Sequence, residues 1–510
     1  MNLFTHFLVY ALSVLVSFNL SAQKLQYKAP VQANIPKPLA TTIDQLFKAY
    51  ADKIHSPGIV YGIVSNGKLI LAGSKGFTDV ENKILVNNQS AFRIASMSKS
   101  FTAMGILILR DAGKLDLDEP VYKYIPELND QISLSLDAPA ITIRHLLTHA
   151  AGFPEDNPWG DRQLAISDEE MLAMFRKGIS FSNIPGETFE YSNMGFAMLG
   201  YIIKKVSGQP YEQYISDNIF KPLGMNNTYW EYDQVPANKF ANGYRYVNGK
   251  WIKETPLHSG AYGAMGGLIT SLEDFAKYMS IHLSAWPPSD SSDKGPLKRS
   301  SMREMHKPWQ LIQMHPNAKT RHGKSCPTLA AYGYGLIWQT DCNQMTQVSH
   351  SGGLPGFGSN WVIAPQYGVG VVAFSNVTYA PMGRITKQVL DTIIAALKLK
   401  RSFIEPSPIL EQRKNELVKI LHDWTSAETS AIFAENFFLD YYVDSLRNQS
   451  NALLKKAGKI IKVHPVVPEN YLRGTFKIEG ERKTINVFFT LTPENPPKVQ
   501  QFEMWEDEGK

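Results

Sequence analysis

A serine followed three residues later by a lysine occurs four times in the sequence, and one occurrence is placed for nucleophilic catalysis. A serine hydroxyl becomes a useful nucleophile only after a base takes its proton, and residues three apart share one face of a helix. Ser96 opens an apolar stretch that predicts a helix over residues 96–110, ending at Gly113. The helix N-terminus would favour negative charge at Ser96, and burial would lower the pKa of Lys99. The other three occurrences lie in less suitable segments, Ser21–Lys24, Ser65–Lys68 and Ser291–Lys294.

Two later segments carry the groups that would assist this nucleophile. Tyr191 and Asn193 precede a second apolar stretch. The phenol can relay protons, and the amide can bind a substrate amide and hold the lysine. The segment His350-Ser351-Gly352-Gly353 begins a glycine-rich turn. Paired glycines let a substrate approach a strand edge closely and leave backbone N–H groups for an oxyanion.

Taken in this order, Ser96-x-x-Lys99, Tyr191-x-Asn193 and His350-Ser351-Gly352 resemble the three signatures of the β-lactamase/penicillin-binding protein superfamily. The branch they resemble contains class C β-lactamases, D-amino-acid carboxypeptidases and related esterases. The resemblance covers roughly residues 40–400. It implies that Ser96 is the nucleophile, that Lys99 and Tyr191 share the roles of base and acid, and that Asn193 contacts the substrate. The backbone N–H groups of Ser96 and Gly353 would form the oxyanion hole, each contributing about 3 kcal/mol.

The third signature departs from the pattern of most β-lactamases at its first position, which is His350 instead of lysine. A lysine there provides a permanent charge for the carboxylate of a penicillin or a peptide terminus. Histidine is mostly neutral near pH 7 and can hydrogen-bond Tyr191 instead. We therefore expect a peptidase or esterase acting on a small-molecule or peptide substrate. A β-lactamase is one alternative, and a catalytically silent protein that binds cell-wall fragments is another.

The N-terminal residues predict export. Phe7 to Leu20 is almost uninterruptedly apolar and is followed by small residues ending at Ala22, which is typical of a cleaved signal peptide over residues 1–22. The stretch is too short for the roughly 20 residues of a membrane span. No later stretch is longer and as apolar, so we expect a secreted or periplasmic protein with no membrane span after cleavage.

Composition argues against several other functions. The net charge of +5 comes from 52 basic and 47 acidic residues scattered along the chain, so no basic face for nucleic acid is visible. His145 and His149 have the spacing of metal ligands on a helix, but Leu146 stands where a zinc peptidase needs glutamate, and no third ligand suggests itself. We expect no metal and no other cofactor, and the oligomeric state stays open.

The expected architecture is α+β in two domains. For residues 23–400 the resemblance implies an antiparallel sheet flanked by helices plus a helical subdomain, with the cleft between them. Composition changes near residue 400, and residues 401–510 predict a small α+β domain of unknown role, with helices over 410–424 and 426–438 and strands over 471–478 and 484–492. Cys326 and Cys342 flank a predicted strand and are either bridged or two free thiols.

Overall fold

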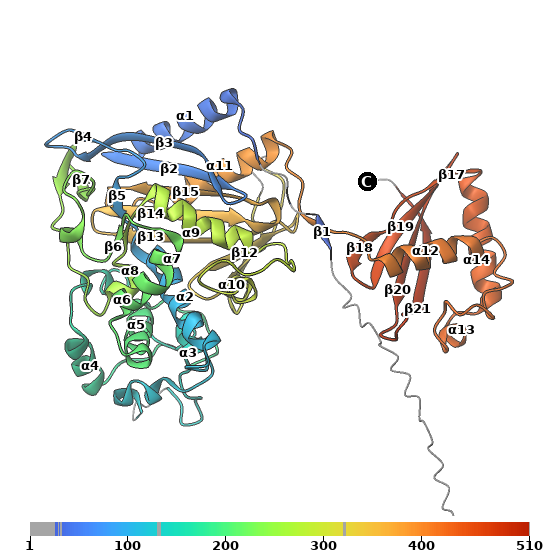
Figure 1. Cartoon of the computed structure of the whole chain (residues 1–510), viewed down its shortest axis with the longest axis horizontal. Coiled ribbons are helices and arrows are strands. Elements are labelled where there is room, and N and C mark those ends of the chain that lie inside the picture. Colours follow the sequence, from blue (N-terminus) through green and yellow to red (C-terminus); the bar gives the residue numbers. More distant parts are fainter. Residues whose placement is uncertain (1–25, 29, 31–32, 130–133, 320–322, 509–510) are drawn as a thin grey trace, which may run out of the picture. The chain divides into compact units, whose positions relative to one another are not determined.

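The computed structural model describes residues 26–28, 30, 33–129, 134–319 and 323–508. The predicted signal peptide lies outside these residues. The chain divides between Phe403 and Ile404 into two compact units, and residues 26–28 group with the C-terminal one (Figure 1). A short strand pair, β1 (Tyr27–Lys28) with β16 (Phe403–Ile404), marks this division.

A nine-stranded antiparallel sheet forms the frame of the larger unit. Its strands, in spatial order, are β10 (Gln310–His315), β11 (Thr328–Tyr332), β12 (Ile337–Asp341), β13 (Thr346–Leu354), β14 (Phe357–Ala364), β15 (Val369–Ser375), β2 (Gly58–Ser65), β3 (Lys68–Asp79) and β4 (Ile84–Leu85). Every residue of β14, β15 and β2 is buried, because helices cover both faces of the central sheet. Strands buried on both faces are continuous apolar runs, as these are.

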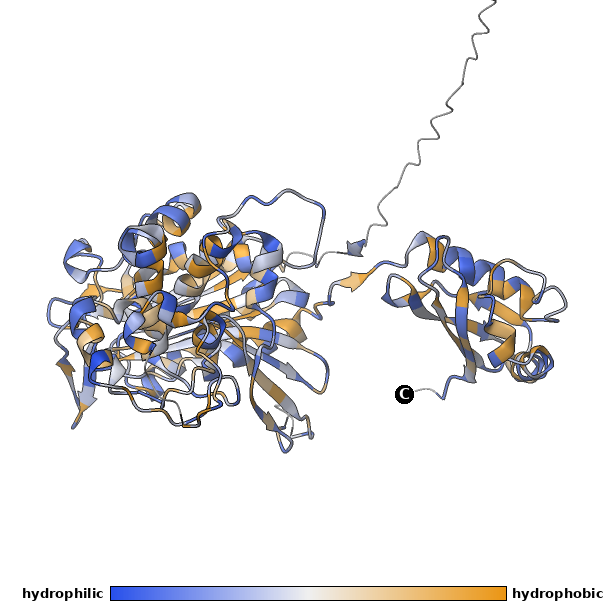
Figure 2. Ribbon diagram, turned by 90° about the horizontal axis from the view of Figure 1, so that it is seen from below, coloured by the Kyte–Doolittle hydropathy of each residue, from blue (hydrophilic) through white to orange (hydrophobic). Residues whose placement is uncertain are grey.

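Two helices, α1 (Lys37–Lys53) and α11 (Gly383–Ala396), pack together on one face and share a core with the central strands. Helix α9 (Leu272–Ser284) packs against β2 and β15 and belongs to the larger core on the other side. Figure 2 shows the hydrophobic segments concentrated inside this unit and the hydrophilic ones on its outer loops. The sheet therefore holds its central strands rigidly between two apolar layers.

A helical region continues from that larger core and contains α2 (Ser98–Asp111) and α5 (Asn193–Ser207), which pack against each other. The remaining helices of the unit are α3 (Ile143–Leu147), α4 (Asp168–Arg176), α6 (Tyr211–Ile215), α7 (Lys221–Leu223), α8 (Gly263–Gly266) and α10 (Arg299–Met305). Its small sheets are β5 (Ala91–Arg93), β9 (Ile269–Ser271) and β6 (Thr228–Tyr229), and the hairpin β7 (Tyr244–Val247) with β8 (Lys250–Lys253). The α+β architecture predicted from the sequence is confirmed.

The C-terminal unit has its own hydrophobic core around the fully buried Trp424. Its five-stranded sheet contains β17 (Ile460–Val463), β18 (Val467–Asn470), β19 (Arg473–Gly480), β20 (Thr484–Leu491) and β21 (Val499–Glu506). The helices are α12 (Pro408–Ile420), α13 (Phe437–Asp440) and α14 (Val443–Ala457). The prediction of a helix over residues 426–438 is wrong, because that segment is mostly turns. The long helix of this region is α14, which begins later, at Val443.

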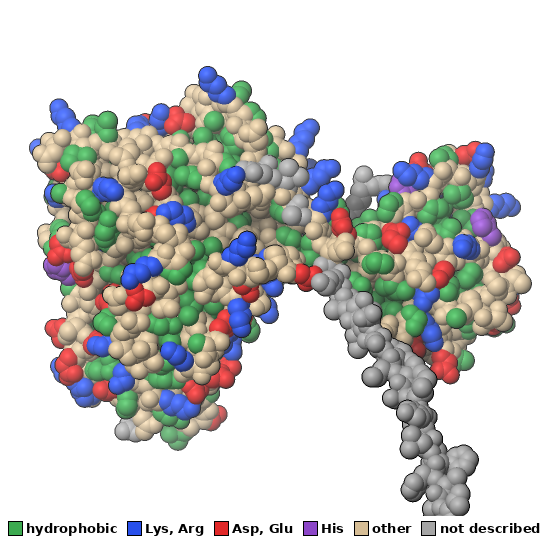
Figure 3. Space-filling model, viewed as in Figure 1, with side chains coloured by type: hydrophobic (Ala, Val, Ile, Leu, Met, Phe, Trp, Pro, Cys, Tyr) green, Lys and Arg blue, Asp and Glu red, His purple; other side chains and the backbone are tan. Residues whose placement is uncertain are grey.

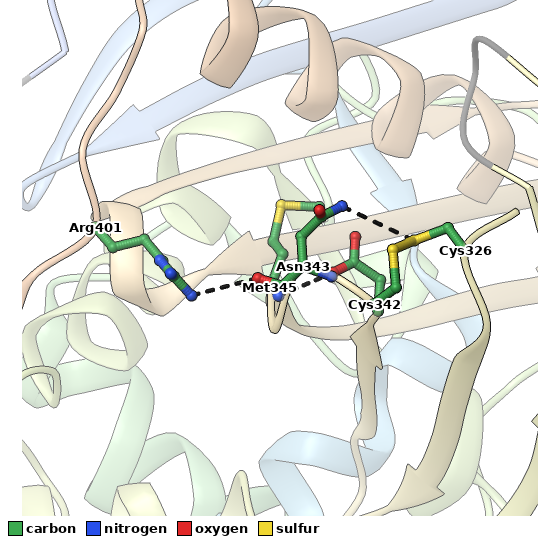
Figure 4. The surroundings of a disulfide bond; sticks show 6 residues. Cys326, Cys342, Asn343, Met345 and Arg401 are labelled. Carbon is green, nitrogen blue, oxygen red and sulfur yellow. Dashed lines mark hydrogen bonds between the residues drawn. A yellow bond between two sulfur atoms is a disulfide. The ribbon is translucent and has the colours of Figure 1, made fainter. Parts of the chain in front are cut away.

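Cys326 and Cys342 form a disulfide in the larger unit (Figure 4). They do not flank one strand, as the sequence suggested, but the open end of the hairpin β11–β12, where Thr328 pairs with Asp341. Asn343 donates a hydrogen bond to the sulfur of Cys326, and Arg401 donates one to the backbone oxygen of Asn343. With 16 residues of separation, the bridge contributes about 3 kcal/mol in the chain-entropy model.

The charge on the surface and the hydropathy of the helices bear on the predicted partners. The face in Figure 3 shows Lys and Arg interspersed with Asp and Glu, which is the mixed surface that the composition suggests. Among the described residues, none of the helices is long and apolar enough to cross a bilayer.

Candidate active site

Ser96 lies in a tight turn where β5 leads into α2. The turn is a short 3-10 helix, η1 (Ala95–Met97), and α2 follows it directly, so the predicted helix starts slightly later than Ser96. Ala95 has φ +49°, a left-handed conformation that non-glycine residues rarely adopt. The Ser98 hydroxyl donates to the Ala95 carbonyl and accepts from the backbone N–H of Leu268, which fixes the turn from both sides. Ser96 is thereby held at the N-terminal end of α2.

Lys99 lies one helical turn after Ser96, with its side chain fully buried. Its ammonium nitrogen is 3.1 Å from Ser96 Oγ, 2.7 Å from Asn193 Oδ1 and 3.0 Å from the backbone oxygen of Met265. These three contacts come from η1, α5 and α8, so the helical region fixes the Lys99 amine beside the hydroxyl.

Burial lowers the pKa of Lys99 from 10.5 to about 7. The charges of Asp161 and Asp156 oppose this effect without cancelling it. Desolvation disfavours the protonated amine because the interior solvates charge poorly. Above pH 7 the amine is therefore mostly neutral and able to take the proton of Ser96.

The Tyr191 ring lies against Lys99, whose Nζ is 4.8 Å from the ring centroid. Burial raises the pKa of Tyr191 strongly, and a hydrogen bond with Ser96 works in the opposite direction. The phenol therefore stays protonated at neutral pH. The His149 ring also packs against Tyr191, with the two ring centroids 4.3 Å apart. Ser96, proposed from the sequence as the nucleophile, thus lies in contact with Lys99 and Tyr191, the two residues proposed for proton transfer.

Asn193 lies beneath the cleft floor and not in its wall. Its Oδ1 accepts from Lys99, and its Nδ2 donates to Asn157 Oδ1 at 2.6 Å. The side chain is fully buried, so the residue that reaches the cleft on this side is Asn157. Asp156 accepts from the backbone N–H groups of Asn193 and Met194 and so caps α5. Sequence patterns could not show this cap, because Asp156 is 37 residues from Asn193.

His350 is buried in β13. The hydrogen bond to Tyr191 that the sequence predicted does not form, and the two ring centroids are 6.4 Å apart. Its Nδ1 donates to the backbone oxygen of Ser351 at 2.6 Å. Its Nε2 is therefore the acceptor for the Tyr332 hydroxyl, 2.8 Å away on β11. Burial lowers the pKa of His350 to about 3, so the ring is neutral. Tyr332 takes the hydrogen bond because β11 and β13 flank the same strand, a pairing that the sequence did not reveal.

The glycines after His350 allow β13 to pass very close to the Ser96 turn. A Cβ on Gly352 would lie 2.1 Å from the Ile94 oxygen and 3.0 Å from the Ala95 Cβ, so no larger residue fits there. A Cβ on Gly353 would lie 2.9 Å from the Tyr379 ring. Ser351 is exposed at the cleft, where its hydroxyl accepts from Asn360. These glycines bring the strand edge beside the nucleophile.

A cleft of about 480 Å³ opens over these groups. Of the described residues that line it, none is lysine or arginine, and the one carboxylate is Asp161. The predicted residues in its wall are Ser96, Tyr191, His350, Ser351, Gly352 and Gly353. The structure adds residues from distant parts of the sequence: Asn157, Pro158, Asp161, Ile337, Tyr379, Ala380 and Pro381.

The histidine pair with metal-ligand spacing serves the backbone. His145 Nδ1 accepts from the N–H of Thr142, and His149 Nδ1 accepts from the N–H of Ser192. In the described ranges, no group of three His, Cys, Asp or Glu side chains is placed to hold a metal ion.

Comparison with known proteins gives one family and one fold. The model of the Beta-lactamase family matches residues 43–395. "Protein flp" from Staphylococcus aureus (strain MW2) is 31% identical over 345 residues, covering 66% of this chain and 64% of that protein, so this chain spans under two thirds of its length. "Beta-lactamase-like protein 4" from Dictyostelium discoideum is 28% identical over 392 residues, covering 71% of this chain and 66% of that protein.

Two solved structures share the fold. The octameric penicillin-binding protein homologue from Pyrococcus abyssi superposes with a TM-score of 0.59 at 22% identity, covering 92% of this chain and 98% of that one. A penicillin-binding protein from Bacillus halodurans superposes with a TM-score of 0.53 at 23% identity, covering 68% of this chain and 99% of that one. Both likenesses support the sheet-and-helix architecture described above.

Proposed function

Because this chain belongs to the Beta-lactamase family, we propose that it is an exported serine hydrolase that forms an acyl-enzyme at Ser96. The observation that carries the proposal is the buried Lys99 amine, 3.1 Å from Ser96 Oγ and with its pKa lowered to about 7. A neutral amine at this distance takes the hydroxyl proton as the oxygen attacks a carbonyl carbon. Tyr191, which is protonated and interacts with Ser96, then delivers a proton to the leaving group and regains one from the protonated Lys99 amine, so that both residues return to their starting forms.

The substrates we propose are amides or esters, either D-amino-acid peptides or small esters, and β-lactams are the less favoured class. The cleft wall in the described part of the chain has no cation, and His350 is neutral there. A β-lactam carboxylate would find no charge partner in this cleft and would face Asp161. We expect kcat/KM for a neutral p-nitrophenyl ester to exceed that for the cephalosporin nitrocefin. The reverse order would overturn the substrate class and leave the Ser96 mechanism intact.

Labelling with a neutral fluorophosphonate tests the mechanism, because the reagent reacts only with an activated serine. We expect the wild-type protein to be labelled and Ser96→Ala to be unlabelled. The matched control is Ser291→Ala, which removes the exposed serine of another Ser-x-x-Lys pattern and should label like wild type. A wild type without labelling, with hydrolysis absent on all substrate classes, would favour the silent cell-wall-fragment binding protein instead.

A further inference from the structure

Asp161 is a buried carboxylate in the cleft wall to which the mechanism assigns no task. It lies in the short 3-10 turn Gly160–Arg162 and is 2% exposed. Its Oδ2 accepts a hydrogen bond from the Tyr379 hydroxyl at 3.0 Å. Among the described residues, its Oδ1 has no hydrogen-bond partner. An ionised oxygen left without donors is costly in a protein interior, so such a group calls for a ligand.

Tyr379 holds this carboxylate at the reactive end of the cleft. Its backbone has φ +53°, a conformation that costs a bulky residue of order 1–3 kcal/mol. Its ring packs directly on Gly353, where a Cβ would lie 2.9 Å from the ring. The tyrosine therefore connects Asp161 to the strand edge beside Ser96. Backbone strain of this kind clusters at ligand sites.

The charges around Asp161 include Lys99, whose positive charge stabilises the ionised carboxylate but is mostly lost above pH 7. Burial raises the pKa of Asp161 to about 6, so the group is ionised at neutral pH. The Lys99 amine, with its pKa near 7, is mostly neutral above that pH and already has three acceptors. Asp156 adds a second negative charge nearby, and Arg162 is directed to solvent as an exposed side chain. Lys99 is a counter-charge for Asp161 only while it is protonated, so above pH 7 a cationic group bound in the cleft would complement Asp161.

We propose that Asp161 binds the ammonium group of the substrate, so that the enzyme acts on amides or esters that carry a free primary amine close to the scissile bond. This inference rests on the proposed serine hydrolase function and names its substrate class. A primary ammonium has three donors, which suit the unpartnered Oδ1 of Asp161 and the other acceptors of the wall. Asp161 is thus a specificity residue, and Tyr379 is the residue that positions it.

Protection of Ser96 from a neutral fluorophosphonate measures this recognition with small probes. D- and L-alaninamide carry an ammonium group beside an amide, and propionamide is the neutral match. At pH 7.5 we expect at least one alaninamide enantiomer to give half-protection at a concentration at least 10-fold below that of propionamide. In Asp161→Asn this advantage should disappear, while the exposed control Asp233→Asn keeps it. A charge-assisted hydrogen bond supports a factor of this order. Because both probes compete for the same serine, any effect of Asp161 on Lys99 cancels in their ratio.

Further variants and outcomes separate the possible failures. Tyr379→Phe should reduce the advantage of alaninamide, because it removes the donor that holds Oδ2. Equal protection by alaninamide and propionamide in wild type, or an advantage retained in Asp161→Asn, would overturn the inference. If the wild type is not labelled at all, the hydrolase proposal fails. Calorimetric titration of alaninamide into the wild type and Asp161→Asn then decides the ammonium site on its own: binding lost in the variant supports it, and no binding in wild type overturns it.

Discussion

Lys99 is the residue whose chemistry depends most on the fold around it. A solvated lysine has a pKa near 10.4 and is a poor base at neutral pH. Here the amine is fully buried among Ser96, Asn193 and Met265, and its pKa falls to about 7. The same residue thus becomes a base suited to neutral solution because water has been removed from it.

The pH dependence of catalysis follows from this shift. Lys99 is protonated below pH 7 and neutral above it, so kcat/KM for a neutral ester should rise with pH and level off above about 7. Lys99→Arg keeps a cation that cannot release its proton and should lose about 10²–10⁴-fold in kcat/KM. The exposed Lys294, from another Ser-x-x-Lys pattern, gives the matched control Lys294→Arg with an unchanged profile. A flat wild-type profile between pH 5.5 and 9 would contradict the assigned base.

Sequence patterns reached the chemistry-bearing residues because each belongs to a short local motif. Ser96 and Lys99 are one helical turn apart, and Tyr191 and Asn193 flank the start of an apolar helix. Asp161, Tyr379 and Tyr332 belong to no such motif, because they reach the cleft only through long-range packing. The predicted hydrogen-bond partner of His350, Tyr191, was wrong for the same reason. The actual partner, Tyr332, becomes its neighbour only through strand pairing.

The turn η1 and the strand β13 determine the geometry of the site together. Ala95 has a left-handed backbone conformation in the turn that carries Ser96, and Gly352 lets the strand edge approach that turn. Their close approach brings the edge of β13 beside the Ser96 turn.

Replacing Gly352 tests this approach. In Gly352→Ala the new methyl group would lie 2.1 Å from the Ile94 oxygen and 2.4 Å from Ser359 Oγ, so β13 must move away from the Ser96 turn. We expect kcat/KM to fall at least 10-fold, since donors displaced by a fraction of an ångström stabilise an oxyanion poorly. Gly295→Ala is the control, because its nearest heavy atom would be 3.8 Å away. Full activity in Gly352→Ala, measured alongside its thermal unfolding, would show that the contact is dispensable.

Strong local signals predicted elements well, and weak ones did not. The apolar stretch that Ser96 opens predicted α2, and the alternating segments over 471–478 and 484–492 predicted β19 and β20. In the C-terminal unit the helix expected over 426–438 is replaced by turns, while α14 was not predicted. Helix α14 has few buried residues, so its pattern is dominated by polar side chains. Its position is fixed by contacts with β20 and β21 that no local pattern encodes.

Among the described residues of the larger unit, four histidines are buried, and we expect them to make the folded protein sensitive to acid. Burial lowers the pKa of His306 and His350 to about 3, and the pKa values of His149 and His282 fall well below 6.5. The unfolded chain binds protons at these sites near pH 6.5 and the folded chain does not. The free energy of unfolding should therefore fall as the pH drops from 6.5 toward 3.

Thermal unfolding of the full chain between pH 5 and 8 measures this sensitivity. His282 and His306 form a hydrogen-bonded pair, and the pair is outside the cleft wall. The double variant His282→Gln with His306→Gln should lose less stability between pH 7 and 5 than the wild type does. His315→Gln, at an exposed position of β10, should keep the wild-type slope. An unchanged slope in the double variant would mean that this pair does not bind protons on unfolding.

The most direct measurement is intact-mass spectrometry of the enzyme quenched milliseconds after mixing with p-nitrophenyl butyrate. We expect the mass to increase by one butyryl group, located by peptide mapping on the peptide that contains Ser96, and we expect no increase in Ser96→Ala. Turnover without any adduct, an adduct on a different residue, or undiminished turnover in Ser96→Ala would contradict an acyl-enzyme formed by Ser96 and activated by Lys99.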